Sequence, residues 1–172
     1  MNSDFLHTRL KDATPVFIRR VHPYDGPIIE NGFHRLSEKT RYYRFLSPVS
    51  RLPAEHLNRL LHCDHINHEV LCAGMVHDRR IEGVGLGQYI RSSQNPAEAE
   101  FAIVIVDDYQ TRGLGGILVH ALIRSCRRNG IKKIFGYYFA ENHRFHALAQ
   151  KYHADIRLES GAVLRADIHL TE

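Results

Sequence analysis

The sequence lacks any long hydrophobic run. None of its segments approaches the roughly 18 consecutive apolar residues that a membrane-spanning helix needs. The start of the chain also lacks a signal-peptide pattern, because charged side chains such as Asp4, Arg9 and Asp12 interrupt it. We therefore expect no membrane partner and a cytoplasmic location.

Cysteine is scarce, and its three residues, Cys63, Cys72 and Cys126, are widely spaced. An odd number of distant thiols does not form a disulfide framework, so we expect free, buried thiols in a reducing compartment. Repeats, low-complexity tracts and long linkers are also missing. We therefore expect one domain over residues 14–172, preceded by a flexible leader at residues 1–13.

Charge of one sign does not dominate the chain. It carries 23 Lys and Arg against 19 Asp and Glu, which gives a net charge of +4. A mildly basic surface suits a polyanionic ligand such as a nucleotide cofactor. The chain has no lysine-rich run and no basic stripe interleaved with aromatic residues, so we expect no nucleic-acid partner.

Apolar periodicity predicts alternating strands and helices. The run at 101–106 is unbroken and rich in β-branched residues, which is typical of a strand buried on both faces. After a turn at 107–116, apolar residues recur at helical spacing until Gly130 ends the helix. We further expect strands at 15–21, 69–76, 83–90 and 131–139, helices around 29–36, 57–61 and 142–152, and a hairpin within 156–170.

The glycine-rich turn between strand and helix predicts an anion site. The first amides of a helix lack internal partners and carry the positive end of the helix dipole. Gly113, Gly115 and Gly116 allow a phosphate to approach those N–H groups because no β-carbon intervenes. Arg112 can add a charge-assisted bond. The alternative, glycines that serve only a tight turn, stays open for the motif on its own.

Two other phosphate-binding patterns fail at this turn. A Walker loop requires Lys-Ser or Lys-Thr after its last glycine, whereas Ile117-Leu118 follows here. A dinucleotide fingerprint has a third glycine where Leu118 stands, and it occurs near the start of a doubly wound sheet rather than two-thirds along the chain.

The turn, Gln110-x-x-Gly113-x-Gly115 after a buried strand, resembles the acetyl-CoA signature of the GNAT N-acetyltransferases. The likeness covers most of the chain and is greatest to the acetyltransferase domain of bacterial Pat-type protein lysine acetyltransferases. The stretches that carry it are Leu36-Ser37-x-x-Thr40-x-Tyr42-x-Arg44-Phe45, Ala99-Glu100-Phe101-Ala102, Asp107-Asp108-Tyr109-Gln110-x-Arg112-Gly113-Leu114-Gly115 and Glu141-Asn142.

The resemblance implies a mixed α/β fold, in which a twisted mixed sheet is flanked by helices and its middle strands separate to admit the pantetheine arm of acetyl-CoA. It also implies an N-acetyltransferase whose partners are acetyl-CoA and an amine-bearing substrate, by direct attack and without a metal. The cofactor-binding residues that follow from it are Ile103, Val104, Ile105, Thr111, Arg112, Gly113, Leu114, Gly115, Gly116 and Asn142. An amide near Ile103 would donate to the thioester oxygen. Asn142 can also serve simply as a helix N-cap.

Glu100 is the candidate catalytic base. It stands at the edge of the apolar run, where partial desolvation raises a carboxyl pKa, and it matches the acidic position of the Pat-type base. Glu98 lies on the same strand face, so either carboxylate could be merely solvated. Many GNAT enzymes carry the acid for the departing thiolate as the tyrosine of a Leu-Tyr pair, which here reads Leu148-Ala149. Tyr137, Tyr138, Tyr152 or water remain as substitutes.

A second cluster, His62-Cys63-Asp64-His65-x-x-His68, contains metal-ligand residue types, but its spacing fits no established zinc pattern. We expect a polar surface loop there, with an acceptor entrance beside Asp64 as an alternative. The function predicted is acetyl transfer to a protein lysine or a small amine. Its rival is a non-catalytic acetyl-CoA sensor that kept the cofactor cradle. The oligomeric state stays open, with a homodimer among the options.

Overall fold

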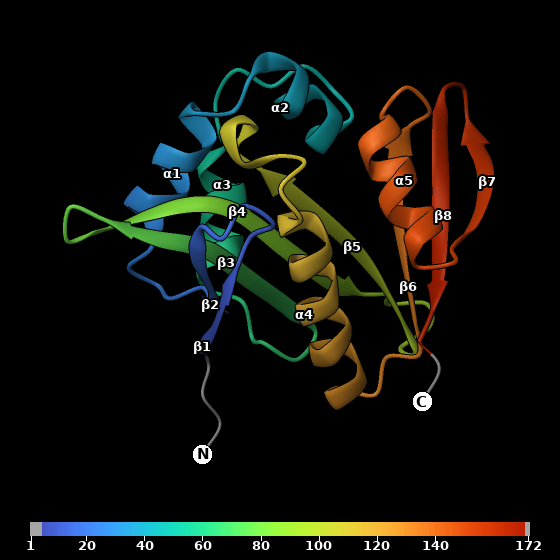
Figure 1. Ribbon diagram of the computed structural model, residues 1–172. Helices are drawn as coiled ribbons and strands as arrows, with labels where there is room; N and C mark the ends of the chain where they lie inside the picture. The colour runs from blue at the N-terminus through green and yellow to red at the C-terminus, as the bar shows by residue number, and fades with distance from the viewer. Residues whose placement is uncertain (1–4, 171–172) are drawn as a thin grey trace.

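One mixed sheet of eight strands runs through residues 5–170, the part of the chain that this computed structural model describes (Figure 1). The strand order is β1-β2-β3-β4-β5-β6-β8-β7, and only β5 and β6 are parallel neighbours. In chain order the elements are β1 (Phe5–Arg9), β2 (Pro15–Arg20), α1 (Gly26–His34), α2 (Glu38–Phe45), α3 (Ala54–Leu61), β3 (His68–His77), β4 (Arg80–Arg91), β5 (Glu98–Ile105), the 3₁₀ turn η1 (Asp107–Tyr109), α4 (Leu114–Arg128), β6 (Lys133–Phe139), α5 (His143–Lys151), β7 (Asp155–Ser160) and β8 (Val163–His169).

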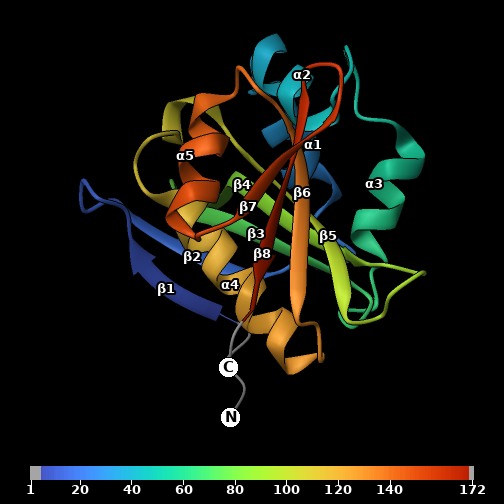
Figure 2. The ribbon, with the colours of Figure 1, turned by 90° about the vertical axis from the view of Figure 1, so that its right-hand side faces the viewer.

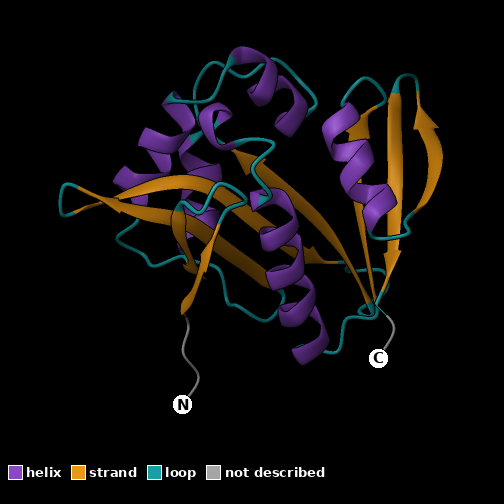
Figure 3. Cartoon of the chain, in the orientation of Figure 1, coloured by secondary structure: helices purple, strands orange, loops and turns teal. Residues whose placement is uncertain are grey.

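Helices cover both faces of the sheet (Figure 3). The side view has α4 and α5 on one side of the strands and α3 on the other (Figure 2). Helix α4 packs on β3, β4 and β5, whereas α1 packs on β4 and on α3. Helix α2 contacts both β5 and β6. The mixed α/β fold with a central mixed sheet is therefore confirmed.

The main core lies between α4 and the sheet, and glycines in β4 set how closely the two approach. Leu118 and Leu122 of α4 are fully buried. A β-carbon at Gly85 would lie 3.2 Å from Leu118 Cδ1, and one at Gly87 would lie 3.2 Å from Leu122 Cδ1. The alternating glycines of β4 thus leave room for the leucine side of α4, whose apolar repeat is the one visible in the sequence.

The start of the chain corrects one prediction. Residues 5–9, expected in a flexible leader, form β1 and pair antiparallel with β2. Residues 1–4 lie outside the described part. Helix α2 was also not anticipated, because its polar sequence has no apolar stripe. Its N-terminus is defined instead by Ser37, whose side chain accepts the Thr40 N–H at 3.2 Å.

The predicted free thiols are present, with one difference in burial. Cys63, Cys72 and Cys126 are all free, but only Cys72 and Cys126 are buried, whereas Cys63 is half-buried. Burial raises the pKa of Cys72 to about 11 and that of Cys126 to about 12, so both thiols stay protonated at neutral pH. Among residues 5–170, no helix is long and apolar enough to cross a membrane.

Candidate active site

The two parallel strands separate after a short region of pairing. β5 and β6 pair only at Glu98↔Lys133, Ala99↔Ile134 and Glu100↔Phe135. Beyond this fork a cleft of about 840 Å³ opens between β5, β6, α5 and the start of α4. Eight of the predicted cofactor residues line it, namely Ile103, Val104, Ile105, Thr111, Gly113, Gly115, Gly116 and Asn142.

The start of α4 has the backbone features of an anion site. Gly113 is its N-cap and has φ +94°, a left-handed conformation that glycine adopts without steric cost. A β-carbon at Gly115 would project into the cleft, 3.5 Å from both Ile105 Cδ1 and Leu148 Cδ2. The cleft therefore reaches the free amides of the first helical turn, which fits the pyrophosphate of a coenzyme A thioester. Leu114 does not line the cleft, because the residue is 1% exposed and packs in the core.

Arg112 is directed away from the cleft. Its guanidinium donates to Asp12 Oδ2 and to Thr14 Oγ1, both at 2.6 Å, and stacks over the Tyr109 ring at 4.9 Å. The side chain therefore ties the glycine-rich turn to the segment between β1 and β2, and does not line the cleft as the sequence led us to expect. The sequence did not indicate this role, because 98 to 100 residues separate Arg112 from Thr14 and Asp12.

Basic side chains that the sequence analysis missed line the cleft instead. Lys11 lies beside Gly113, where an added β-carbon would be 3.3 Å from Lys11 Cγ. Lys151 Nζ would be 3.4 Å from a β-carbon at Gly116. Lys39 and Arg144 also line the cleft. Lys11 precedes β2, Lys39 belongs to α2, and Arg144 and Lys151 both belong to α5, so no single local pattern marks the four as cleft residues.

Two of the stretches that carry the family resemblance, at 36–45 and 141–142, also stabilise the fold around the cleft. Ser37 Oγ and Thr40 Oγ1 donate to Asp107 Oδ1 at 2.7 and 2.8 Å, which fixes the start of α2 against η1. Burial favours the neutral acid, but the hydrogen bonds from Ser37 and Thr40 outweigh it and lower the pKa of Asp107. Asn142 caps α5, because its side chain accepts the Phe145 N–H at 3.2 Å, and it lines the cleft as well.

Glu100 and Glu98, which the sequence could not separate, have different surroundings. Glu98 binds Lys133 Nζ at 3.0 Å and accepts from Asn95 Nδ2 at 2.8 Å. Glu100 forms no ion pair with any residue that the structure describes. It is exposed at the last paired position of the fork, on the sheet face opposite α4, and does not itself line the cleft.

The electrostatics at Glu100 favour a carboxylate that can accept a proton. Although the residue is exposed overall, the protein around its carboxyl group removes part of the water there and raises the pKa of Glu100, whereas the positive charges of Arg44 and Arg165 oppose this shift. Arg165 is held by Asp167 at 2.8 Å, but Arg44 makes no ion pair within residues 5–170. Burial lowers the pKa of Arg44 to about 10, so the side chain stays charged at neutral pH.

The sequence model of the acetyltransferase (GNAT) family matches residues 34–154. This chain belongs to the GNAT acetyltransferase family. It is 30% identical to Acetyltransferase PA5475 of Pseudomonas aeruginosa over 133 residues, which cover 77% of this chain and 71% of that protein. The predicted family and enzyme class are thereby confirmed.

Solved structures carry the same fold. The GNAT domain of S. lividans PAT superimposes with a TM-score of 0.91 at 21% identity, over 99% of both chains. The structure of yncA, a putative acetyltransferase from Salmonella typhimurium with its cofactor acetyl-CoA, has a TM-score of 0.71 at 14% identity, over 91% of this chain and 95% of that one. At these identities the likeness concerns the fold alone.

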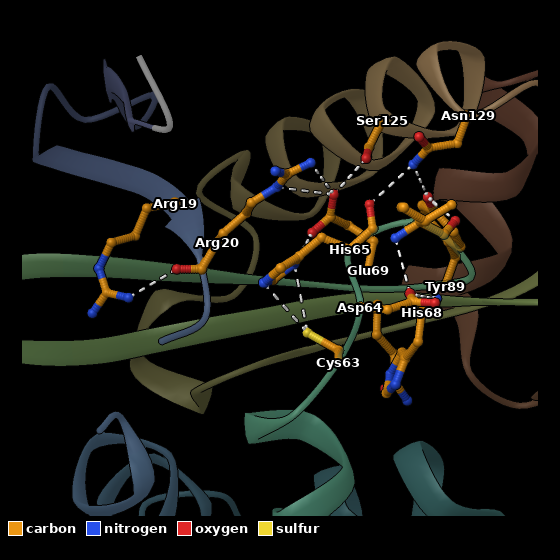
Figure 4. Close-up of polar contacts among 12 residues, drawn as sticks. Arg19, Arg20, Cys63, Asp64, His65, His68, Glu69, Tyr89, Ser125 and Asn129 are labelled. Carbon is orange, nitrogen blue, oxygen red and sulfur yellow. Dashed lines mark hydrogen bonds and ion pairs between the residues drawn. The ribbon is translucent and has the colours of Figure 1, made fainter. Parts of the chain in front are cut away.

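The second candidate cluster in this GNAT domain is a hydrogen-bonded loop (Figure 4). The Asp64 carboxylate accepts the backbone N–H groups of Ile66, Asn67 and His68 at 2.7 to 2.9 Å, and these bonds lower its pKa despite the opposing effect of desolvation. His65 Nδ1 lies 2.7 Å from Glu69 Oε1. Asp64 does not line the cleft, and within residues 5–170 no group of three or more ligand-type side chains is arranged to hold a metal ion.

Proposed function

We propose that this GNAT domain transfers the acetyl group of acetyl-CoA directly to an amine, with a protein lysine as the acceptor and Glu100 as the base. The observation that carries the proposal is the extent of the cleft, which runs from the glycines of α4 to Phe101 and Ala102, next to Glu100 in the chain. Arg44, whose charge acts on Glu100, lines the cleft as well. The resemblance to Pat-type protein lysine acetyltransferases supports the choice of lysine.

The reaction requires a neutral amine. Glu100 takes a proton from the acceptor's ammonium group, and the freed nitrogen attacks the thioester carbon. The raised pKa of Glu100 makes it a stronger base than an ordinary glutamate, while Arg44 limits that rise. On the donor side, the first amides of α4 bind the pyrophosphate, and an amide near Ile103 donates to the carbonyl oxygen as negative charge develops there.

Glu100→Gln tests the proposal against the matched control Glu98→Gln. We expect turnover at neutral pH to fall roughly 100-fold or more in Glu100→Gln, the usual contribution of a general base. Acetyl-CoA affinity, measured by calorimetry, stays nearly the same because Glu100 lies outside the cleft. Wild-type turnover rises with pH as Glu100 loses its proton, and the variant lacks that rise. Equal turnover in both variants removes Glu100 from its role.

A non-catalytic acetyl-CoA sensor is the second candidate, and one observation favours it. Ala149 occupies the position where many GNAT enzymes carry the acidic tyrosine. A sensor binds acetyl-CoA in calorimetry but releases no thiol across a panel of amines and lysine peptides, whereas the enzyme releases thiol with at least one of them. We place either activity in the cytoplasm, where three free cysteines stay reduced.

A further inference from the structure

If the domain acetylates a lysine, as proposed, the charges around Glu100 decide which lysines can approach it. Within residues 5–170 two cations act on the Glu100 carboxylate, namely Arg44 and Arg165. Arg165 already has its partners, because it donates to Asp167 from Nη2 at 2.8 Å and to Tyr137 Oη from Nη1 at 3.2 Å. Its charge is therefore largely neutralised by the Asp167 carboxylate.

The Arg44 guanidinium has no such partner. It forms no ion pair or hydrogen bond with the residues that the structure describes. Its central carbon lies 5.1 Å from the centroid of the Phe45 ring, which attracts a cation but accepts no strong hydrogen bond. A guanidinium presents five N–H donors in a fork that matches a carboxylate through two parallel bonds. These donors remain available to a ligand.

Arg44 lines two hollows at once. The first is a pocket of about 60 Å³ between α1, α2, α3 and the sheet, and its other side chains are apolar except for His56. Burial and the charge of Arg44 lower the pKa of His56 to about 4, so this ring adds no charge at neutral pH. A carboxylate is costly to bury among apolar side chains. An anion that neutralises Arg44 must therefore come from the second hollow, the cleft.

Arg44 meets the cleft on the face of the sheet that carries Glu100. Residues of a strand alternate between its faces, so Glu100, Ala102 and Val104 of β5 share one face. Val104 packs with the residues beneath α3, whereas Ile103 packs in the core beneath α4. Ala102 and Val104 line the cleft together with Arg44. Arg44 is thus separated by the sheet from the glycine-rich end of α4.

The other lysine and arginine side chains of the cleft do not share this position. None of them acts on the pKa of Glu100, and they are Lys11, Lys39, Arg144 and Lys151. Lys11 and Lys151 lie beside the glycine-rich turn, and Arg144 donates to Gln110 of that turn. Arg44 is therefore the unpaired cation of the cleft that lies nearest to the proposed base.

We propose that Arg44 selects acceptors that carry a carboxylate beside the reactive amine. The preferred acceptor is a lysine with an acidic neighbour or with the free carboxylate of a chain end. Its carboxylate binds the Arg44 guanidinium while its ammonium group approaches Glu100. A second positive charge on the acceptor is instead repelled by Arg44, so polycationic amines are poor substrates.

Lysine peptides with a blocked N-terminus provide the test. One set differs only in the two residues beside a central lysine, which are Glu, Gln or Arg. We expect kcat/KM for the Glu peptide to exceed that for the Gln peptide roughly 10-fold or more, and the Arg peptide to be the poorest. A second pair ends on the lysine, with a free carboxylate or an amide, and shows whether a chain end can supply the negative charge.

Arg44→Gln is compared with the wild type and with Arg59→Gln. Arg59 is exposed on α3, paired with Glu55 at 3.4 Å and outside the cleft, so it is the control for loss of a positive charge. We expect Arg44→Gln to lose the preference for the Glu peptide, whereas Arg59→Gln keeps it. Loss of Arg44 also changes the pKa of Glu100, but that change affects every peptide alike and cancels in the ratio. The KM for acetyl-CoA stays the same.

The wild type alone can overturn the proposal, because equal kcat/KM values within both peptide sets leave Arg44 without a role in selection. A preference that survives in Arg44→Gln also overturns it. Arg44→Met, which keeps a long apolar stem beside Phe45, replaces Arg44→Gln if circular dichroism shows that the latter is unfolded. Binding of acetyl-CoA without acetylation of any peptide instead refutes the proposed function.

Discussion

Replacing Gly115 with alanine separates the stability of the fold from its affinity for coenzyme A. Gly115 is the second residue of α4, and its missing β-carbon would stand in ordinary contact with Ile105 and Leu148, at 3.5 Å from each. No backbone atom is among its nearest neighbours, so the folded protein accepts the methyl group. The methyl group does, however, occupy the approach to the amides at the start of the helix.

We expect Gly115→Ala to stabilise the fold and to weaken the binding of coenzyme A. Alanine in a helix interior is favoured over glycine by about 1 kcal/mol, an upper bound for a residue in the first turn. Unfolding of the unliganded variant in urea should therefore require at least as much denaturant as the wild type. Loss of one hydrogen bond to a charged phosphate costs about 1.5–3 kcal/mol, which weakens binding roughly 10- to 150-fold.

Calorimetric titration with coenzyme A measures the second effect. His120→Ala is the matched control, because His120 is exposed on the same helix and away from the cleft. It gains a few tenths of a kcal/mol from helix propensity and leaves coenzyme A affinity unchanged. An unaltered dissociation constant in Gly115→Ala would refute the assignment of the α4 amides to the pyrophosphate.

Two further predictions concern buried charges away from the cleft. Glu69 is fully buried, where it accepts from Ser125 Oγ at 2.5 Å and from Arg20 Nη2 at 3.1 Å. Glu69→Ala leaves these donors without their acceptor, so we expect a loss of about 3–5 kcal/mol in urea unfolding, and a loss below 1 kcal/mol would contradict this. Burial opposes ionisation of Asp25, but its bonds to Arg19 at 2.5 and 2.8 Å lower the Asp25 pKa overall. A lowered folded-state pKa contributes stability that is present above the unfolded value of about 3.9 and is lost as pH falls through the folded value. Asp25→Asn should therefore unfold with a flatter pH dependence in that acid range, and an unchanged pH dependence would count against the pair.

The elements found from the sequence are those with strong local periodicity. The β-branched run of β5 and the leucine repeat of α4 predict their own conformation, and the glycine turn between them follows from elementary backbone chemistry. β1 escaped detection because it is an edge strand whose existence depends on pairing with β2. Helix α2 escaped because polar residues fill it and its anchor, Asp107, lies far along the chain.

The candidate site likewise contains positions that the sequence could predict and positions that it could not. Glycines and strand residues on one continuous segment were predictable as neighbours in one cleft, because their positions depend on the backbone. The outward turn of Arg112 was not, since it requires Asp12 and Thr14 from the other end of the chain. Neither was the ion pair of Glu98 with Lys133, which distinguishes Glu98 from Glu100, the base that the sequence predicts.

The two sides of the proposed site differ in how far their sequence can change. In the proposed mechanism the donor side consists of amides at the start of α4 and of strand edges at the fork, and their positions are set by backbone conformation and register. Many sequences can therefore maintain the same cradle, which fits a fold shared at 21% identity over the whole chain. The proposed acceptor side consists of side chains such as Glu100, Arg44 and Arg165, from three different elements, and each can change without disturbing the sheet. Exchange of Arg44 for leucine should accordingly alter which amines are acetylated more than it alters acetyl-CoA affinity, because a change of charge beside the base acts on the acceptor and not on the amides of α4.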